Sequence, residues 1–381
     1  MPRNTHSLEN NLKQVRTKAG LTQGQLAASA RISRQAYSAL ESGNANPSTE
    51  VALRLAKVLR QTVESLFYIT ERPQIVIEAE LVSGSAFETL SGATGQRARL
   101  FRVGSKMFAR PLSGPQNTRH TLVAAEGLVV SQANTGRQVT VQPFDSDDVE
   151  SPTLTMLGCD PAAGLLESGL RSRGIVLVAA EESSGAALLG LANGEAHIAG
   201  CHLLDETTGA YNRSWVEQLV PFPCTLVTFA SWQQGLILPY RNPKNVSSVA
   251  DLADPELRLI NRQVGSGSRA LFDRTLAAAG IPTSLVTGYH REESGHMAVA
   301  VAVASGIADV GIGVKAAAVA MGLDFVPLQE ERYDLVIPQH FLSHEPVQAL
   351  LDLLRHPVLH RKVESLGGYD TSNMGLQPSF T

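Results

Sequence analysis

The tightest constraint on how this chain folds is a closely spaced series of short helix signals in its first seventy residues. Apolar side chains recur every three to four residues over 8–19, and Gly20 is the residue type that ends a helix in the left-handed conformation. Three hydroxyl residues stand where the N-caps of the next helices belong: Thr22, Ser33 and Ser48. The spacing predicts a bundle of five short helices whose last helix covers 63–67.

The same seventy residues carry an excess of positive charge. Nine Lys and Arg stand against four Asp and Glu, a net charge of +5, whereas the rest of the chain carries −9. The second and third expected helices are joined by a turn of about three to four residues, the arrangement that lets the second helix of a pair enter a major groove. A small basic head on an acidic body indicates nucleic acid as the partner of the head.

Residues 12–48 resemble the Xre/Cro family of helix-turn-helix domains. The motifs that carry the resemblance are Arg16, Gly20-Leu21-Thr22-Gln23, Gln25-Leu26-Ala27, Ile32-Ser33, Leu40-Glu41-Ser42-Gly43 and Asn46-Pro47-Ser48. The resemblance implies that double-stranded DNA is contacted by Gln23, Arg34, Gln35 and Ser38, because Gln and Arg bond base edges and Ser holds phosphates. A helical protein-interaction bundle is the less favoured alternative, since Arg and Gln on any solvated helix look alike.

The middle of the chain has a different pattern. Short β-branched or alternating runs at 74–79, 98–103, 107–110, 127–131 and 138–141 are separated by Ser, Gly, Asn and Pro, which predicts strands and turns. Residues 145–151 are polar and indicate a linker. This segment is either a small barrel that spaces two functional modules or a surface for dimerisation, and it carries no recognisable chemistry.

From residue 153 onward, strand-like runs alternate with helical patterns, which predicts a parallel sheet covered by helices. The expected elements include a strand at 285–287, separate strands at 226–229 and 236–238, and a last helix at 346–354. In such sheets ligands bind at the carboxyl ends of strands, where small polar residues and helix N-termini gather. We therefore expect a small-molecule or oxyanion ligand to be bound by Cys159, Asp160, Ser183, Ser184, His202, Ser266, Gly267, Ser268, Arg269, Ser294 and His296, with Arg269 supplying positive charge.

Residues 153–375 resemble the periplasmic-binding-protein-like domains that are fused to helix-turn-helix heads in bacterial regulators. The resemblance is carried by Gly158-Cys159-Asp160-Pro161, residues 193–203, Gln234-Gly235-Leu236, Asn261-Arg262, Gly288-Tyr289, residues 306–311 and residues 323–328. It implies two α/β lobes joined by crossing strands, with a ligand in a cleft that closes on binding. Similar domains bind molybdate or tungstate, so the resemblance makes that class of oxyanion a candidate ligand.

The expected fold is thus multidomain: an all-α helix-turn-helix head over residues 1–70, a small β-rich segment over 71–150 and a two-lobed α/β periplasmic-binding-protein-like domain over 151–381. Hydrophobic residues make up 43% of the chain and charged residues 18%, which fits folded domains and not a disordered chain. The first ten residues lack the apolar core of a secretory signal, and no run is long enough to span a membrane, so we expect a cytoplasmic protein without a membrane partner.

Several other readings are less favoured. Cys159, Asp160, Cys201 and His202 follow neighbouring strands and could form a soft metal or thiol-sensing site, but buried Cys is usually a small hydrophobe, and we expect neither metal nor cofactor. Residues 311–316 match a dinucleotide fingerprint but do not open a βαβ unit. Residues 330–334 look like a solvated turn. No nucleophile elbow, Walker motif or H-E-x-x-H is present, so an enzyme is not expected.

The sequence predicts a one-component transcriptional regulator that acts as a homodimer or higher homo-oligomer. Its head would bind operator DNA, and its last domain would sense a small polar ligand. The alternative keeps the DNA-binding head and makes the C-terminal domain a ligand-independent platform for oligomerisation or partner binding. The sequence leaves open the ligand, the operator, the sign of regulation and the dimer interface.

Overall fold

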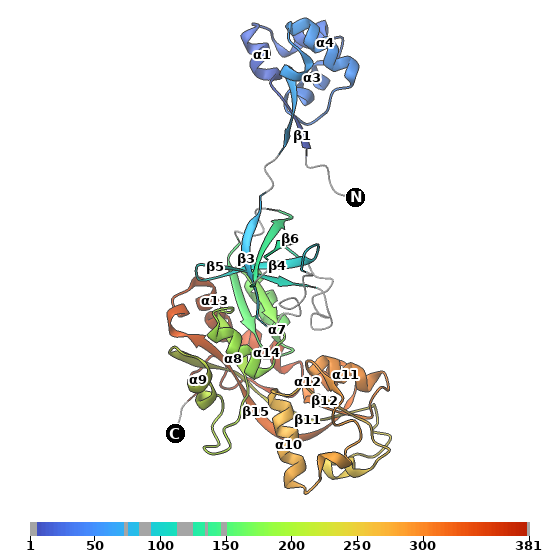
Figure 1. The fold of residues 1–381 in the computed structure, drawn as a ribbon, viewed down its shortest axis with the longest axis vertical. Helices are drawn as coiled ribbons and strands as arrows, with labels where there is room; N and C mark the ends of the chain where they lie inside the picture. The colour runs from blue at the N-terminus through green and yellow to red at the C-terminus, as the bar shows by residue number, and fades with distance from the viewer. Residues whose placement is uncertain are drawn as a thin grey trace. The chain divides into compact units, whose positions relative to one another are not determined.

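The computed structural model describes residues 6–71, 75–83, 93–112, 125–133, 136–145 and 151–378. Contacts divide the chain into two compact units, Met1–Ile75 and Val76–Thr381, each with its own hydrophobic core (Figure 1). Within the described ranges, none of the helices combines the length and the apolar character needed to cross a bilayer.

The first unit is the helical head, and its expected bundle of five helices is confirmed. The helices are α1 Leu12–Lys18, α2 Gln23–Ser29, α3 Arg34–Glu41, α4 Thr49–Leu59 and α5 Val63–Leu66. The side chains of Thr22, Ser33 and Ser48 each accept a hydrogen bond from a backbone N–H in the first turn of the helix they precede. The core of the head is built from side chains without exposure, among them Leu12, Leu26, Tyr37, Leu55 and Leu66.

Two strands of the head are absent from the sequence-based expectation. Strands β1 His6–Asn10 and β2 Phe67–Glu71 pair antiparallel, with Asn10 opposite Phe67. The first helix therefore begins at Leu12 and not at Leu8, and Phe67 lies in a strand and not in the last helix. This pairing joins the two ends of the unit, and such a distant pairing leaves no local periodicity in the sequence.

The β-rich segment begins the second unit and is a closed barrel. Its strands are β3 Ile77–Leu81, β4 Arg97–Val103, β5 Lys106–Pro111, β6 Gly127–Gln132 and β7 Gln138–Pro143, in the closed order β3-β5-β4-β6-β7. Side chains such as Leu81, Leu100 and Val141 fill its interior. All five expected strands are present. The expected first-strand start at Gln74, and residues 146–150 of the expected linker, lie outside the described residues.

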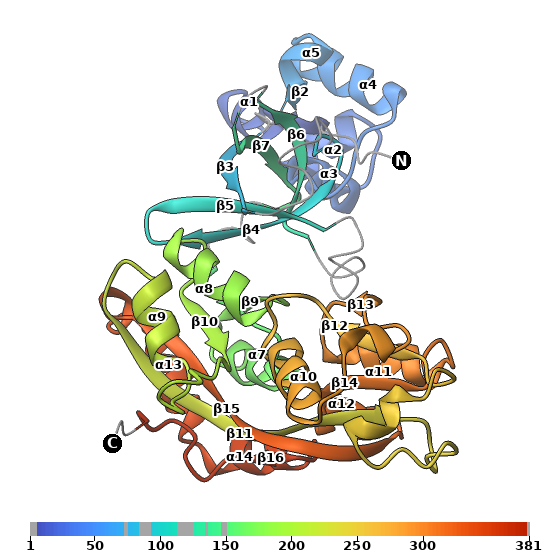
Figure 2. The same ribbon diagram turned by 60° about the horizontal axis from the view of Figure 1, so that its bottom comes forward.

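Two α/β lobes follow the barrel (Figure 2). Lobe 1 holds β8 Thr153–Leu157, β9 Val176–Ala180 and β10 Ile198–Cys201, with α7 Ala163–Arg171, α8 Ser184–Ala192, α9 Arg213–Leu219, α13 Glu345–Leu354 and α14 Pro357–Glu364. Lobe 2 holds β12 Leu259–Arg262, β13 Glu292–Glu293 and β14 Val310–Val314, with α10 Gly267–Ala278, α11 His296–Ala304 and α12 Lys315–Ala320.

Two long antiparallel strands, β11 Cys224–Leu238 and β15 Asp324–Pro338, run through both lobes and join them (Figure 2). They make one sheet of order β13-β12-β14-β11-β15-β10-β8-β9, with the short strand β16 Tyr369–Asp370 added to β11. The two-lobed fold with crossing strands is confirmed. Three details differ from expectation: 226–229 and 236–238 belong to one strand, no strand forms over 285–287, where Leu285 ends the 3₁₀ turn Thr283–Leu285, and α14 follows the helix expected to be last.

The barrel packs directly on lobe 1. Val82, Phe101 and Phe108 of the barrel form an apolar cluster with Val178 of β9. Beside it, the buried carboxylate of Glu195 accepts a hydrogen bond from the backbone N–H of Ser83 at 3.0 Å. The same carboxylate forms an ion pair with Arg137 Nη1 at 2.6 Å. The contact joins the barrel to the loop that follows α8.

Candidate functional site

A network of polar and charged side chains joins helices α1, α2 and α3 of the head. Arg16 of α1 makes a two-point ion pair with Glu41 at the end of α3, with Nη2–Oε1 at 2.8 Å and Nε–Oε2 at 3.1 Å. This guanidinium lowers the pKa of the Glu41 carboxyl. Gln23 at the start of α2 donates to the same carboxylate at 3.3 Å, so its predicted DNA contact would be made from within this network.

Three other residues predicted to contact DNA lie on α3. Arg34 and Gln35 are exposed in its first turn, and Ser38 is half-buried one turn further along. The opposite face of α3 carries Tyr37 and Leu40, which are buried in the head core. The helix therefore presents its N-terminal polar residues to solvent, as a recognition helix does. The individual DNA contacts stay predictions.

In the second unit, helix N-termini from both lobes meet at the carboxyl ends of the strands. Ser183 caps α8 of lobe 1 by accepting from the N–H of Ala186, and Ser266 caps α10 of lobe 2 by accepting from the N–H of Arg269. The two ends face each other closely, since a Cβ on Gly185 would lie 3.7 Å from the carbonyl oxygen of Gly265. Such N-termini offer backbone N–H groups to an anion or a polar oxygen.

The most concentrated chemistry in the cleft is a cluster of Cys159, His202 and His296. Cys159 Sγ lies 3.7 Å from His202 Nε2 and 3.7 Å from His296 Nε2. The three donor atoms lie within 4.8 Å of one another, and all three residues are buried. Cys159 and His202 follow β8 and β10 of lobe 1, whereas His296 begins α11 of lobe 2. The cluster therefore spans the two lobes.

Glu331 of the crossing strand β15 holds one of these histidines. His202 Nδ1 and Glu331 Oε2 are 2.8 Å apart, and both side chains are 1% exposed. Burial alone would lower the pKa of His202, but its hydrogen bonds with Cys159 and Glu331 raise it to about 9. The backbone N–H of His202 also donates to Ser184 Oγ at 3.2 Å. Contacts at both ring nitrogens and at the backbone therefore hold His202 in place.

The crossing strands form the floor of the cleft. Trp232 of β11 packs edge-on against His202 and His296, with ring centroids 5.0 and 5.6 Å apart, and lies opposite Glu331 in the strand register. Gln234 lies two residues further along and so shares its face of the strand. Some of the buried polar atoms that have no hydrogen-bond partner among the described residues belong to Trp232, Gln234, Ser268 and Tyr333, which are essentially unexposed. Buried polar atoms of this kind call for an explanation, such as a bound ligand.

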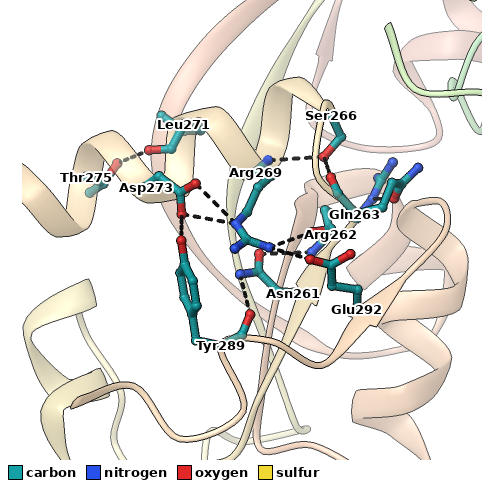
Figure 3. Close-up of polar contacts among 10 residues, drawn as sticks. All are labelled: Asn261, Arg262, Gln263, Ser266, Arg269, Leu271, Asp273, Thr275, Tyr289 and Glu292. Atoms are coloured by element: carbon teal, nitrogen blue, oxygen red, sulfur yellow. Dashed lines mark hydrogen bonds and ion pairs between the residues drawn. The ribbon is translucent and has the colours of Figure 1, made fainter. Parts of the chain in front are cut away.

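Arg269 lies among hydrogen-bond partners of its own lobe (Figure 3). Its guanidinium bonds Asp273 at 3.1 Å, Glu292 at 2.9 Å and the carbonyl of Arg262 at 3.2 Å, and it stacks 4.2 Å over the ring of Tyr289. These partners all lie in lobe 2. These bonds occupy the guanidinium in this structure and stabilise lobe 2, and the predicted contact of Arg269 with a ligand stays a prediction.

The other predicted residues divide between the cleft and the scaffold. Asp160 accepts from the hydroxyl of Tyr369 at 2.7 Å and from the backbone N–H of Ala162 at 2.6 Å, and so holds the turn before α7. Ser294 is exposed. Cys201, which could have shared a sulfur site with Cys159, packs into the lobe-1 core, and burial raises the pKa of its thiol well above the usual value.

The two lobes touch one another in this structure. Gly267 at the start of α10 lies against the ring and carbonyl of His202, so closely that a Cβ would be 2.7 Å from that carbonyl oxygen. Gly295, at φ +80°, lies against the carboxylate of Glu181 from lobe 1. A cavity of about 640 Å³ is lined by residues of both lobes, among them Gly158, Asp160 and Met297, but not by Cys159, His202 or His296 themselves.

Sequence reasoning missed the residues of the crossing strands. The segment 330–334 was interpreted as a solvated turn, but it lies in β15, where Glu331, Tyr333 and Asp334 are buried. Asp334 is held by Asn212 at 2.8 Å and Thr228 at 3.0 Å. The signal that could have found this strand is the direct continuation of the charged run into the apolar residues 335–337.

Comparison with known proteins identifies both parts of the chain. Residues 12–66 match the Helix-turn-helix family model, and residues 167–355 match the model described as PBP superfamily domain. A protein encoded in the 5′ region of the ferredoxin 2Fe-2S gene of Clostridium pasteurianum is 38% identical over 106 residues, which are 28% of this chain and 94% of that protein. The chain belongs to the same family as this protein, and it combines an Xre-type helix-turn-helix domain with a PBP superfamily domain.

YvgK of Bacillus subtilis (strain 168) is 34% identical over 189 residues, or 49% of this chain, and the match spans 61% of the length of YvgK. Among solved structures, the sulfate-binding protein SubI from Mycobacterium tuberculosis H37Rv is 13% identical with a TM-score of 0.42, covering 57% of this chain and 86% of SubI. The CcmR regulatory domain of Synechocystis PCC6803 in complex with 2-PG is 13% identical with a TM-score of 0.41, covering 53% and 95%.

Proposed function

We propose that this chain is a one-component transcriptional regulator: its head binds operator DNA, and a small polar ligand in the cleft between the lobes sets the affinity for DNA. The observation that carries the ligand-binding role is the set of buried polar atoms in Trp232, Gln234, Ser268 and Tyr333 that have no partner among the described residues. Such groups favour a ligand in the cleft over a platform that binds none, because each unsatisfied buried polar atom costs about 1–3 kcal/mol.

An oxyanion such as molybdate or tungstate is the first ligand class we propose. Its support is the meeting of the α8 and α10 N-termini across the cleft, capped by Ser183 and Ser266. Ser268, in the first turn of α10, adds a buried hydroxyl. Arg269 is not part of this proposal, because its guanidinium already has several partners within lobe 2.

A ligand can alter DNA binding only by its different affinity for two states of the protein. The contacts of Gly267 with His202 and of Gly295 with Glu181 support a closed state of the lobes as one of them. We propose that the protein acts as a homodimer, since one small head reads only a half-site. We also propose that the ligand is bound and released without chemical change.

The test is a thermal-shift screen of the full chain against molybdate, tungstate, sulfate, phosphate, amino acids, sugars and divalent metals. A ligand of the cleft must raise the melting temperature of the folded unit that binds it. Ser268→Ala should reduce that shift, and Ser284→Ala, which changes an exposed serine in the 3₁₀ turn Thr283–Leu285 of lobe 2, is the matched control that should keep it. Silence across the whole panel would favour a ligand-independent platform instead.

A further inference from the structure

We infer that Cys159, His202 and His296 form a binding site for a transition-metal ion with zinc-like coordination preferences. The inference rests on the proposed function in one respect, namely that the metal ion binds in the same cleft as the proposed ligand. Its evidence is the arrangement of three side chains from two lobes.

The spacing of the donor atoms matches tetrahedral coordination. Zinc bonds thiolate sulfur at about 2.3 Å and imidazole nitrogen at about 2.0 Å, so a sulfur and a nitrogen on one tetrahedral ion lie roughly 3.5 Å apart. Cys159 Sγ lies 3.7 Å from each of the two Nε2 atoms. The two Nε2 atoms lie within 4.8 Å of each other, against roughly 3.3 Å on one tetrahedral ion, so a bound ion would draw the two imidazoles together by up to about 1.5 Å.

The orientation of His202 is the one that a metal ligand requires. Glu331 accepts from Nδ1 at 2.8 Å, which keeps a proton on that nitrogen, so Nε2, which faces Cys159, is the nitrogen that would bond the ion once the ion displaces its proton. A carboxylate that bonds the second nitrogen of a metal-binding histidine is the usual outer partner of such sites. Glu331 lies on β15, one of the strands that join the lobes, so the orientation is built into the hinge.

The residue types select the kind of ion. A thiolate and two imidazoles suit zinc and its neighbours cobalt, nickel and copper, whereas calcium and magnesium prefer oxygen ligands. The buried charges also balance, because the thiolate of Cys159 and the carboxylate of Glu331 together match a divalent cation. Without such pairing, charges at this depth would be costly.

Three protein ligands leave a fourth position open for water or a small anion, as in zinc sites that are not purely structural. Because His296 belongs to lobe 2 and the other two ligands to lobe 1, the ion would link the lobes and favour their contact.

The experiment titrates the reduced, chelator-stripped full chain with Co²⁺ and then with Zn²⁺. We expect one Co²⁺ per chain, with a thiolate-to-cobalt charge-transfer band that Zn²⁺ removes. Cys159→Ser should abolish the band and His296→Ala should strongly weaken binding. Cys224→Ser is the matched control, because Cys224 is a half-buried thiol at the start of β11, and it should leave the titration unchanged.

Glu331→Gln keeps all three ligands, and it tests the site even if Cys159→Ser fails to fold. We expect the charge-transfer band to persist and the affinity to fall about 10- to 100-fold. A wild-type chain that binds no Co²⁺ in one-to-one ratio, or a band that survives in a folded Cys159→Ser variant, would overturn the inference. The titration does not involve DNA, so its outcome is independent of whether the protein regulates transcription.

Discussion

Replacing Gly267 by Ala should open the cleft without harming either lobe. Gly267 is the first residue of α10, where Ala is at least as favourable as Gly for the helix itself. The added methyl group would, however, fall on the ring of His202 and 2.7 Å from its carbonyl oxygen, a backbone atom that cannot move alone. Overpacking of this kind costs about 1–3 kcal/mol. Only the state in which the lobes touch bears that cost, so the ratio of open to closed molecules should rise roughly 5- to 150-fold.

Trp232 reports on this change. It is 1% exposed on the cleft floor, whereas the other tryptophan, Trp215 on α9, is 37% exposed. In a Trp215→Phe background, acrylamide should quench Trp232 more readily in Gly267→Ala than in the parent chain. Gly164→Ala is the control, because a Cβ there meets nothing within 4 Å and should leave quenching unchanged. Equal quenching of Trp232 in the parent and in Gly267→Ala would refute the argument that this contact closes the cleft.

Three further outcomes are expected. Arg137→Ala removes the ionic partner of the buried Glu195 and should lower the free energy of unfolding by about 3 kcal/mol in urea titrations, whereas pairing it with Glu195→Gln should recover part of the loss. Asp309→Asn should be destabilising at pH 7, because Arg258 and Lys244 hold the pKa of that carboxyl well below its usual range. A depressed pKa contributes stability above the ordinary carboxyl pKa and loses it as the pH falls, so the deficit should be about 1 kcal/mol smaller at pH 3 than at pH 7; an equal deficit would contradict the ion pair. Arg34→Ala with Gln35→Ala should relax sequence discrimination in DNA-binding titrations and leave the thermal response to the cleft ligand intact, and unchanged discrimination would remove these residues from the DNA-reading face.

The helices of the head and the strands of the barrel could be predicted because their signals are local. Caps such as Thr22 and Ser33 and the apolar periodicity between them act within one turn of helix. The antiparallel pair β1–β2 was missed because its hydrogen bonds join the two ends of the unit. The crossing strand β15 was missed for a related reason: burial of Glu331 and Asp334 depends on partners that come from other segments, and a charged run alone resembles a surface turn.

The candidate site was predictable to the level of loops but not of side-chain directions. Cys159, His202 and His296 follow strand ends or begin a helix, and the sheet brings those ends together. Whether a residue then faces the cleft depends on competing partners. Arg269 finds Asp273 and Glu292 within its own lobe, and Cys201 faces the lobe-1 core, and neither preference is visible in the sequence.

The central claim is that occupancy of the cleft sets the affinity of the head for DNA. The most direct test selects a preferred DNA sequence with the full chain and then measures its affinity by fluorescence anisotropy, with and without the ligand that gave the thermal shift. The account predicts a change of about 5- to 150-fold at constant salt, and its loss in Ser268→Ala. A ligand that binds the cleft stoichiometrically while DNA affinity stays the same would contradict it.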